Sequence, residues 1–451
     1  MCRTATELLL KYRLLSNYYF RAGMEQLIGI FTTRPHPRIN YVATMLSHWW
    51  GVRVSVNPEP ETASATIHYG QAGAGIQLPM HPIMQAEEVP GYESLELNTT
   101  FPWSEDFDPL AAIFFCLSRY EEYQDFQADR HLRFPATASI AYQQGWLREP
   151  MAVRWADQLY QDLRKYQSSL PPLTREFVLL PTYDIDIAWA YRERGWRGWL
   201  RMAMDLFGGY FKRVSERLGV MLSNKRDPYD VFDRLEETHQ ANGLKAQYFW
   251  LLAKKRSRLN PNVSPNSRRL AQLIGKVASR EENTLGIHPS YHSATQSGLF
   301  AEEIGLLQSI LLQPIKHSRQ HFLRFNTPET FRDLIDNGVQ HEHSMAYADT
   351  HGWRAGTHLP FYWYDLLREE TTSLMIHPFP VMDATLRHYL GLSPDEGRKV
   401  LDFYRQQIEE LGGPLQLLWH NSSFSHSHGW GAYGEMYLDF LREAGNAGST
   451  D

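Results

Sequence analysis

Residues 177–186 read Phe-Val-Leu-Leu-Pro-Thr-Tyr-Asp-Ile-Asp, an apolar run that ends in two carboxylates. Such a run is typical of a buried strand. Side chains alternate along a strand, so Asp184 and Asp186 face the same side. Two neighbouring carboxylates repel each other unless a cation or a proton lies between them. The stretch therefore predicts a functional site at the end of a strand, rather than the helix cap or salt-bridged pair that such residues form elsewhere.

A pair of histidines follows about 100 residues downstream, in Gly-Ile-His288-Pro-Ser-Tyr-His292-Ser. Two imidazoles four residues apart converge on one side of a helical turn, where they can bind one divalent ion. The chain has 19 histidines, so the spacing alone says little. Together with the Asp-x-Asp strand end it predicts a metal site with the ligands Asp186, His288 and His292. Asp184 would lie beside the metal as a general base.

Strands and helices alternate after residue 174, which predicts an α/β fold with a parallel sheet or barrel. Strand-like segments cover 177–183, 247–252, 284–288, 314–317, 374–377 and 415–420, with a weak one near 341–347. Helix-like segments cover 229–241, 267–280, 301–312, 328–336, 394–411 and 435–443. In such folds the chemistry lies at the carboxyl ends of the strands, where both aspartates, both histidines and His420 fall.

The chain has 451 residues, so two domains are expected. The polar, proline-rich break at 167–174 predicts a boundary between a smaller α/β domain of unknown role (1–173) and a barrel domain (174–451). A helix is expected at 108–123, capped by Asp108.

Composition excludes several classes of protein. The net charge of −6 argues against a nucleic-acid-binding protein. Cys2 and Cys116 are the only cysteines, so a metal must be held by histidine and carboxylate. The N-terminus lacks the apolar core of a signal peptide, and no apolar run is long enough to span a membrane, so we expect a cytoplasmic protein. The basic, aromatic segment 190–227 is either a solvated insertion at the barrel rim, a lid, a sugar-contacting surface or a membrane-surface helix.

Other residues are weaker candidates. His420 follows the apolar run 415–419 and is either a general acid or a core histidine. An arginine should orient the base carboxylate, with Arg319 preferred over Arg354. Further supporting candidates are Arg324, Asp349 and Asp383. Polar stretches hold the pairs His341/His343 and His426/His428, which we expect in solvated loops. Sugar-stacking candidates, each more readily explained by core packing, are Trp353, Tyr362, Trp363 and Trp430.

These residues resemble the motifs of the polysaccharide deacetylase superfamily, the nodulation-protein-B-like carbohydrate esterases, over about 174–451. Thr182-Tyr-Asp-Ile-Asp186 resembles the family's first motif and His288-x-x-x-His292 its second. The third motif, centred on an arginine, is matched by Arg319-Gln-His-Phe in place of Arg-Pro-Pro-Tyr. The last motif is matched by Leu417-Leu-Trp-His420, and no clear Asp-x-x-Trp motif is present. Residues 107–123 resemble the uncharacterised region that precedes this domain in a bacterial subgroup.

The resemblance implies a distorted (β/α)7 barrel that binds a divalent metal, most plausibly Zn²⁺, through Asp186, His288 and His292. It also implies catalysis by Asp184 as base, Arg319 as the group that orients it, and His420 as acid, with His420 tuned by an unidentified partner for which Asp349 is a candidate. The substrate would be an acetylated carbohydrate and the reaction its deacetylation. Two alternatives remain, an amidase acting on small non-sugar amides and a catalytically silent carbohydrate-binding protein.

Overall fold

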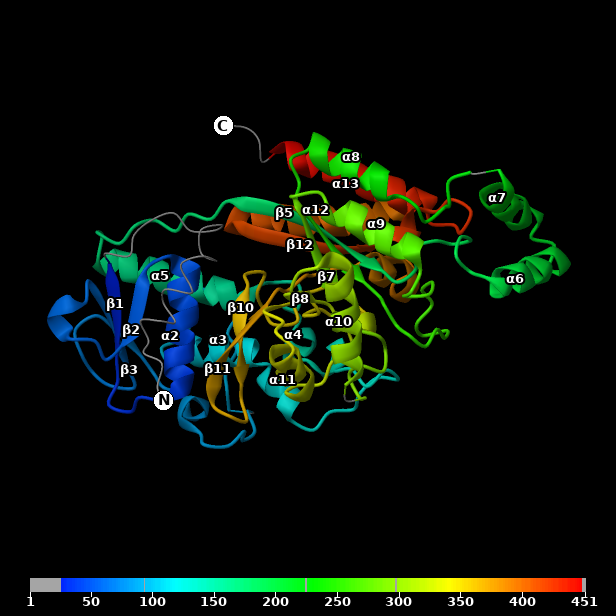
Figure 1. The fold of residues 1–451 in the computed structure, drawn as a ribbon. Coiled ribbons are helices and arrows are strands. Elements are labelled where there is room, and N and C mark those ends of the chain that lie inside the picture. Colours follow the sequence, from blue (N-terminus) through cyan, green and yellow to red (C-terminus); the bar gives the residue numbers. More distant parts are fainter. Residues whose placement is uncertain (1–25, 93, 224, 297, 448–451) are drawn as a thin grey trace.

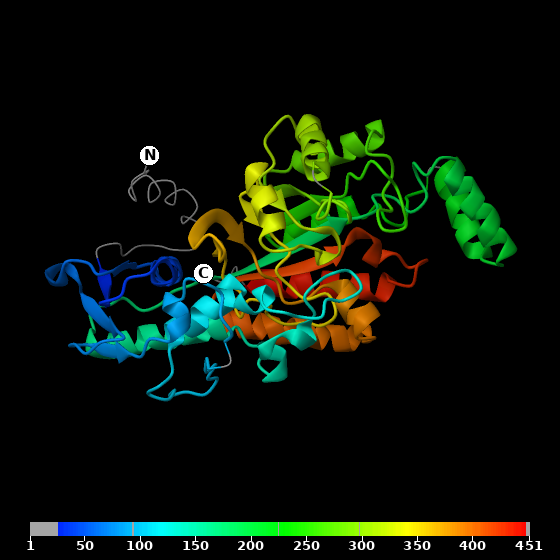
Figure 2. The same cartoon turned by 90° about the horizontal axis from the view of Figure 1, so that it is seen from below.

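The computed structural model describes residues 26–92, 94–223, 225–296 and 298–447. Its strands form two sheets, one all parallel and one parallel except for a single strand (Figures 1 and 2). The smaller sheet is all parallel, in the order β2-β1-β3-β4, with bounds β1 Leu27–Phe31, β2 Arg53–Val56, β3 Ala65–Tyr69 and β4 Ile76–Leu78. The larger sheet has eight strands. The predicted α/β class, with a smaller α/β unit before the larger one, is confirmed.

Helices α2 (Pro37–Trp50) and α5 (Met151–Tyr166) contact the smaller sheet, and α3 (Pro109–Ser118) packs against both of these helices and against β10 (Phe361–Asp365) of the larger sheet. The Asp108 side chain accepts hydrogen bonds from the amides of Leu110 and Ala111, as expected of a helix cap. The helix ends earlier than predicted, because Arg119 adopts a left-handed conformation (φ 54°) that starts a short 3-10 turn at Tyr120–Tyr123. A short helix, α4 (Ile140–Gln143), lies between α3 and α5.

The larger sheet has the order β10-β11-β9-β8-β7-β6-β5-β12 and is parallel except for β10, which runs antiparallel to β11. Its strands are β5 Phe177–Ile185, β6 Ala246–Trp250, β7 Asn283–Ile287, β8 His317–Ser318, β9 His341–Glu342, β10 Phe361–Asp365, β11 Glu370–Ile376 and β12 Gly413–His420. The helices that accompany it are α8 Phe232–Ala241, α9 Arg268–Ala278, α10 Leu299–Leu311, α11 Glu329–Asp336, α12 Pro394–Leu411 and α13 Gly431–Ala447. A helical hairpin, α6 (Trp196–Phe207) and α7 (Phe211–Leu222), interrupts the alternation after β5.

The larger sheet curls into a half-barrel. Its terminal strands are β10 and β12, and the chain that follows β11 bends round to β12, where Met382 forms an isolated bridge with Leu418. The amide of Leu418 donates to the carbonyl of Val381. The barrel is therefore distorted, as expected, and its last side is closed by a loop segment rather than by a strand.

The two units share one hydrophobic core. The Tyr41 hydroxyl of α2 donates to the carbonyl of Tyr362 in β10 (2.8 Å), and the Trp49 indole donates to the carbonyl of Pro360 (3.0 Å). Three of the proposed sugar-stacking residues, Trp353, Tyr362 and Trp363, are buried in this core. They are core residues, so the prediction that they contact a sugar is wrong. The division at residue 174 stays a prediction.

Within the described ranges, no helix is both long and apolar enough to cross a membrane. The N-terminal residues on which the expectation of a missing signal peptide rests lie outside these ranges.

Candidate metal centre and active site

The carboxyl edge of the larger sheet gathers the candidate residues. Asp184 lies near the end of β5 and Asp186 follows that strand by one residue. His288 follows β7 directly, and His321 comes three residues after β8. Strands β5, β6, β7 and β8 are neighbours and parallel, so their ends place these side chains together.

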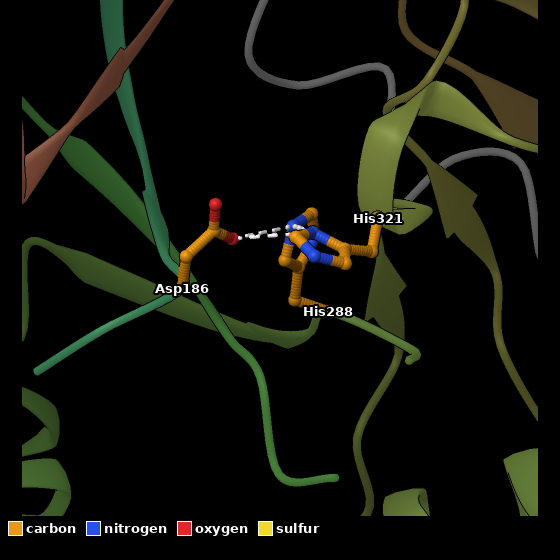
Figure 3. A group of neighbouring side chains, drawn as sticks. All are labelled: Asp186, His288 and His321. Carbon is orange, nitrogen blue, oxygen red and sulfur yellow. Dashed lines mark hydrogen bonds and ion pairs between the residues drawn. The ribbon is translucent and has the colours of Figure 1, made fainter. Parts of the chain in front are cut away.

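Asp186, His288 and His321 form a group that could hold a metal ion, with one ligand atom from each residue lying within 4.8 Å of the others (Figure 3). Asp186 Oδ1 lies 3.1 Å from His288 Nε2 and 3.3 Å from His321 Nδ1. The two imidazole nitrogens lie 2.9 Å apart. One carboxylate and two imidazoles are a donor set typical of zinc sites that keep positions open for water and substrate.

Each imidazole has an inner nitrogen, which faces the cluster, and an outer nitrogen, which faces away from it. Both outer nitrogens contact backbone carbonyls, which accept hydrogen bonds and cannot donate them. His288 Nδ1 lies 2.6 Å from the carbonyl of Arg319, and His321 Nε2 lies 2.8 Å from the carbonyl of Leu259. Each outer nitrogen therefore carries the hydrogen, and each inner nitrogen of a neutral ring turns its lone pair toward the cluster. Metal-binding histidines are commonly fixed in this way. Two lone pairs that face each other at 2.9 Å need a proton or a cation between them.

The carboxylates strengthen this need for positive charge. Asp186 Oδ1 is buried and makes no hydrogen bond, an orphaned anionic oxygen aimed at the two rings. Burial alone would lower the pKa of His288, but the charges of Asp184 and Asp186 outweigh it and raise that pKa above its usual value. Burial likewise opposes ionisation of Asp186, yet the facing imidazoles of His321 and His288 hold the pKa of its carboxyl well below its usual range. The residues present therefore fit a divalent cation.

His292 does not belong to this cluster. Its side chain is exposed and its ring packs edge-on against Tyr291. The sequence expectation assumed a helical turn from His288, but the chain leaves β7 in extended form, with the amide of His288 still bonded to the carbonyl of Trp250. The turn starts only at Tyr291, so the second imidazole beside Asp186 comes from His321 instead. The usable signal for His321 is its place two residues after Arg319, just past a predicted strand.

Arg319 contacts the expected base. Its Nη1 donates to Asp184 Oδ1 (3.1 Å) and to Thr182 Oγ1 (2.8 Å), and its Nε donates to the carbonyl of His343 (2.8 Å). The guanidinium is fully buried between the rings of Phe249 and Phe379. Burial lowers the pKa of Arg319 and the charge of Asp184 opposes that effect. A guanidinium so held fixes the orientation of the Asp184 carboxylate.

The alternative arginine lies elsewhere. Arg354 forms a two-pronged ion pair with Glu122 of the N-terminal unit (2.8 and 2.7 Å). Burial opposes ionisation of Glu122, but Arg354 and Arg119 outweigh it and lower the pKa of that carboxyl to about 2. Arg324 donates to the carbonyls of His131 and Tyr291. Both arginines therefore tie segments of the chain together.

His420, the last residue of β12, lies on the other side of the cluster, with Nε2 3.7 Å from Asp186 Oδ2. Its Nδ1 lies 2.7 Å from Asp383 Oδ1, and its amide donates to Asp383 Oδ2 (2.8 Å). Burial would lower its pKa, but the charges of Asp383, Asp186 and Asp184 raise the pKa of His420 to about 10. A cation bound beside Asp186 would act against that rise. The partner that holds His420 is thus Asp383, not Asp349, the candidate named from the sequence.

The remaining histidine pairs differ from expectation in part. His341 and His343 are buried rather than solvated: the ring of His343 stacks on His377 (centroids 4.4 Å apart) and that of His341 stacks on His317 (4.4 Å). The two stacks are also linked through their ring nitrogens, His341 Nδ1 to His377 Nε2 (3.0 Å) and His317 Nδ1 to His343 Nε2 (3.1 Å). His426 is exposed, as expected, and lies 3.4 Å from Glu435.

Comparisons with known proteins give one family model and several solved structures. A family model described as "Family of unknown function (DUF7033)" matches residues 28–168, and no curated protein matches the chain. Among solved structures, a "putative polysaccharide deacetylase" from Mycobacterium smegmatis is similar at 13% identity and TM-score 0.40, over 61% of this chain and 85% of that one.

Two further solved structures are similar to the chain. One is a "putative polysaccharide deacetylase involved in o-antigen biosynthesis" from Bordetella bronchiseptica (13% identity, TM-score 0.31, 58% of this chain and 83% of that one). The other is a CE4 family pseudoenzyme from Bacillus anthracis (12% identity, TM-score 0.28, 59% of this chain and 61% of that one). Residues 28–168 carry a domain of the family of unknown function DUF7033, the uncharacterised region that the sequence predicts ahead of the larger unit.

Proposed function

We propose that the protein is a metal-dependent deacetylase that removes acetyl groups from a carbohydrate. The observation that carries the proposal is one cluster of possible metal ligands, Asp186, His288 and His321. A candidate base and a candidate acid lie on either side of it. On one side an arginine holds Asp184, and on the other an aspartate holds His420. A carboxylate and an imidazole held on either side of a metal site are the usual parts of acid–base catalysis.

Asp186, His288 and His321 would hold the metal, most plausibly Zn²⁺. When bound, such an ion lowers the pKa of water and polarises a carbonyl oxygen. Asp184, oriented by Arg319, takes the proton from the attacking water. The water oxygen bonds to the acetyl carbon and the C–N bond breaks, while His420 gives a proton to the departing nitrogen. Water and acetamide thus become acetate and a free amine.

Removal of the metal should abolish the activity. After dialysis against a strong chelator, the protein is expected to release no acetate from acetylated chito-oligosaccharides, and stoichiometric Zn²⁺ is expected to restore release because the ligands are prearranged. Release of ammonia from small amides instead of acetate from the sugars would identify an amidase. Bound sugar with no release of either product by the metal-loaded protein would identify a binding protein.

Asp383 should act as a positioning residue for His420. Asp383→Asn keeps an acceptor near Nδ1 but removes the negative charge, which lowers the pKa of His420. We expect kcat to fall about 10- to 100-fold, less than the full general-acid contribution of about 100- to 10,000-fold, because the imidazole itself remains. The alkaline limb of the kcat profile should move to lower pH, since the acid then loses its proton earlier. An unchanged pH profile with reduced protein stability would show a merely structural role.

A further inference from the structure

The α6–α7 hairpin stands away from the rest of the molecule (Figures 1 and 2). Its two ends meet at Asp227, whose carboxylate accepts hydrogen bonds from the amides of Ala190, Tyr191 and Arg192 (2.7, 2.8 and 3.1 Å). The helices are joined by Arg217 of α7, which donates to the carbonyl of Gly198 and pairs with Asp205 of α6 (2.8 Å). The hairpin is therefore a folded element with fixed ends.

The apolar stripe of α6 faces solvent. Apolar side chains recur every three or four residues along this helix, the spacing of one helical face. A helix of a soluble protein normally buries such a face, yet here it is exposed at Trp196 (71%), Trp199 (49%), Leu200 (53%), Met204 (63%) and Phe207 (91%). The tip adds Tyr210 and Phe211, also exposed. An exposed patch of apolar side chains aligned along one helical face marks a docking surface.

The same segment is basic. Residues 190–227 contain nine Lys and Arg against four Asp and Glu, a net charge of +5 in a chain whose net charge is −6. All four acidic side chains are engaged within the protein, Asp227 and Asp205 as above, Glu193 with Ser267 and Arg269, and Glu216 with Tyr191. Arg201 and Lys212 are exposed. The outward charge of the hairpin is thus positive.

We propose that the α6–α7 hairpin docks onto the surface of an anionic phospholipid bilayer. Exposed Trp, Phe and Leu side chains would enter the boundary between head groups and acyl chains, while Arg and Lys contact the lipid phosphates. A second copy of the chain fits this surface less well, because two hairpins of charge +5 repel each other. A nucleic acid fits less well because the rest of the chain is strongly acidic and the exposed stripe is apolar.

Docking would hold the candidate active site near the bilayer. The hairpin begins ten residues after Asp186, a length of chain that spans at most about 36 Å when fully extended. This consequence rests on the proposed function and favours an acetylated glycan that lies close to a membrane. The docking itself does not depend on catalysis.

Cosedimentation of the full chain with lipid vesicles tests the proposal. We expect binding to vesicles of three parts phosphatidylcholine to one part phosphatidylglycerol, little binding to phosphatidylcholine alone, and weaker binding at high salt. Phe207→Ser should weaken binding about tenfold, since a large apolar side chain leaves the lipid. Leu312→Ser is the matched control, because Leu312 is equally exposed (90% against 91%) but lies at the end of α10.

Charge is tested separately. Arg201→Gln and Lys212→Gln should each weaken binding to anionic vesicles about fivefold and leave the weak binding to neutral vesicles unchanged. Asp184→Asn should bind vesicles like the wild type, so that a failure of the deacetylase proposal stays distinguishable from a failure of docking.

Three outcomes would overturn docking on a bilayer. They are no binding to either kind of vesicle, equal losses from Phe207→Ser and Leu312→Ser, and a concentration-dependent dimer that Phe207→Ser dissociates while vesicles remain unbound. The last would assign the patch to a second copy of the chain.

Discussion

Asp184→Asn is expected to lower kcat for acetate release by about two to four orders of magnitude while the protein keeps its metal. The metal stays because Asp186, His288 and His321 are untouched. The loss is large because an amide cannot accept the proton that a carboxylate takes from water. The Asp184 side chain is 3.6 Å from His288 Nε2, so it lies beside the cluster without being part of it.

Folding of this variant should be preserved. Arg319 would lose its ion pair with Asp184 but would keep Thr182 Oγ1 and the carbonyl of His343 as acceptors. The introduced amide also retains an acceptor oxygen in a side chain of the same size. Steady-state acetate release, metal content by elemental analysis and thermal melting would be measured on the same preparation. Wild-type turnover by Asp184→Asn would remove Asp184 from the mechanism, and loss of metal would make it a ligand rather than a base.

Arg354→Met is the matched test for the choice between the two arginines. It breaks a buried pair with Glu122 and leaves the Arg319–Asp184 pair intact, so it should destabilise the protein by about 3–5 kcal/mol while kcat of the folded fraction is kept. Urea unfolding and kcat per folded molecule separate these effects. A loss of turnover in a variant of unchanged stability would contradict the assignment.

The long buried strands could be predicted from the sequence because each of them is a continuous apolar run. β5 and β12 are buried along most of their length, and both were expected. β8 and β9 have only two residues each, so the strands expected at 314–317 and near 341–347 were located only approximately. β10 was not predicted, and its burial depends in part on contacts with Tyr41 and Phe114 of the N-terminal unit, which lie far away in sequence.

In the candidate site, too, contacts between residues far apart in sequence could not be predicted. Strand ends predicted that Asp184, Asp186, His288, His292 and His420 would gather, and the structure brings all of these except His292 together. Arg319, expected as the group that orients the base, joins them. The partners of the arginines and of His420 come from segments far apart in sequence: Arg354 meets Glu122, and His420 meets Asp383. No local pattern encodes such pairings. The expected roles of all these residues remain predictions until variants are measured.

His321→Ala should weaken Zn²⁺ binding at least about 100-fold, whereas His292→Ala should leave it within about twofold. The first change removes one of the three donors, and Asp186 and His288 alone offer too few ligands for a stable site. The second removes an exposed ring that lies outside the cluster. Affinity would be measured by competition with a chelator of known strength, with His288→Ala as the reference for a lost ligand.

This comparison decides between two geometries that the sequence leaves open. If the His-x-x-x-His spacing supplied both imidazoles, as the resemblance implies, His292→Ala and His288→Ala would weaken binding equally and His321→Ala would not. In the structure His321 is instead fixed for binding: its Nε2 hydrogen is engaged by the carbonyl of Leu259, which leaves Nδ1 facing Asp186 at 3.3 Å. The donor that completes the cluster therefore lies two residues after Arg319, so that the segment directly after β8 would supply both a metal ligand and the cation that orients the base.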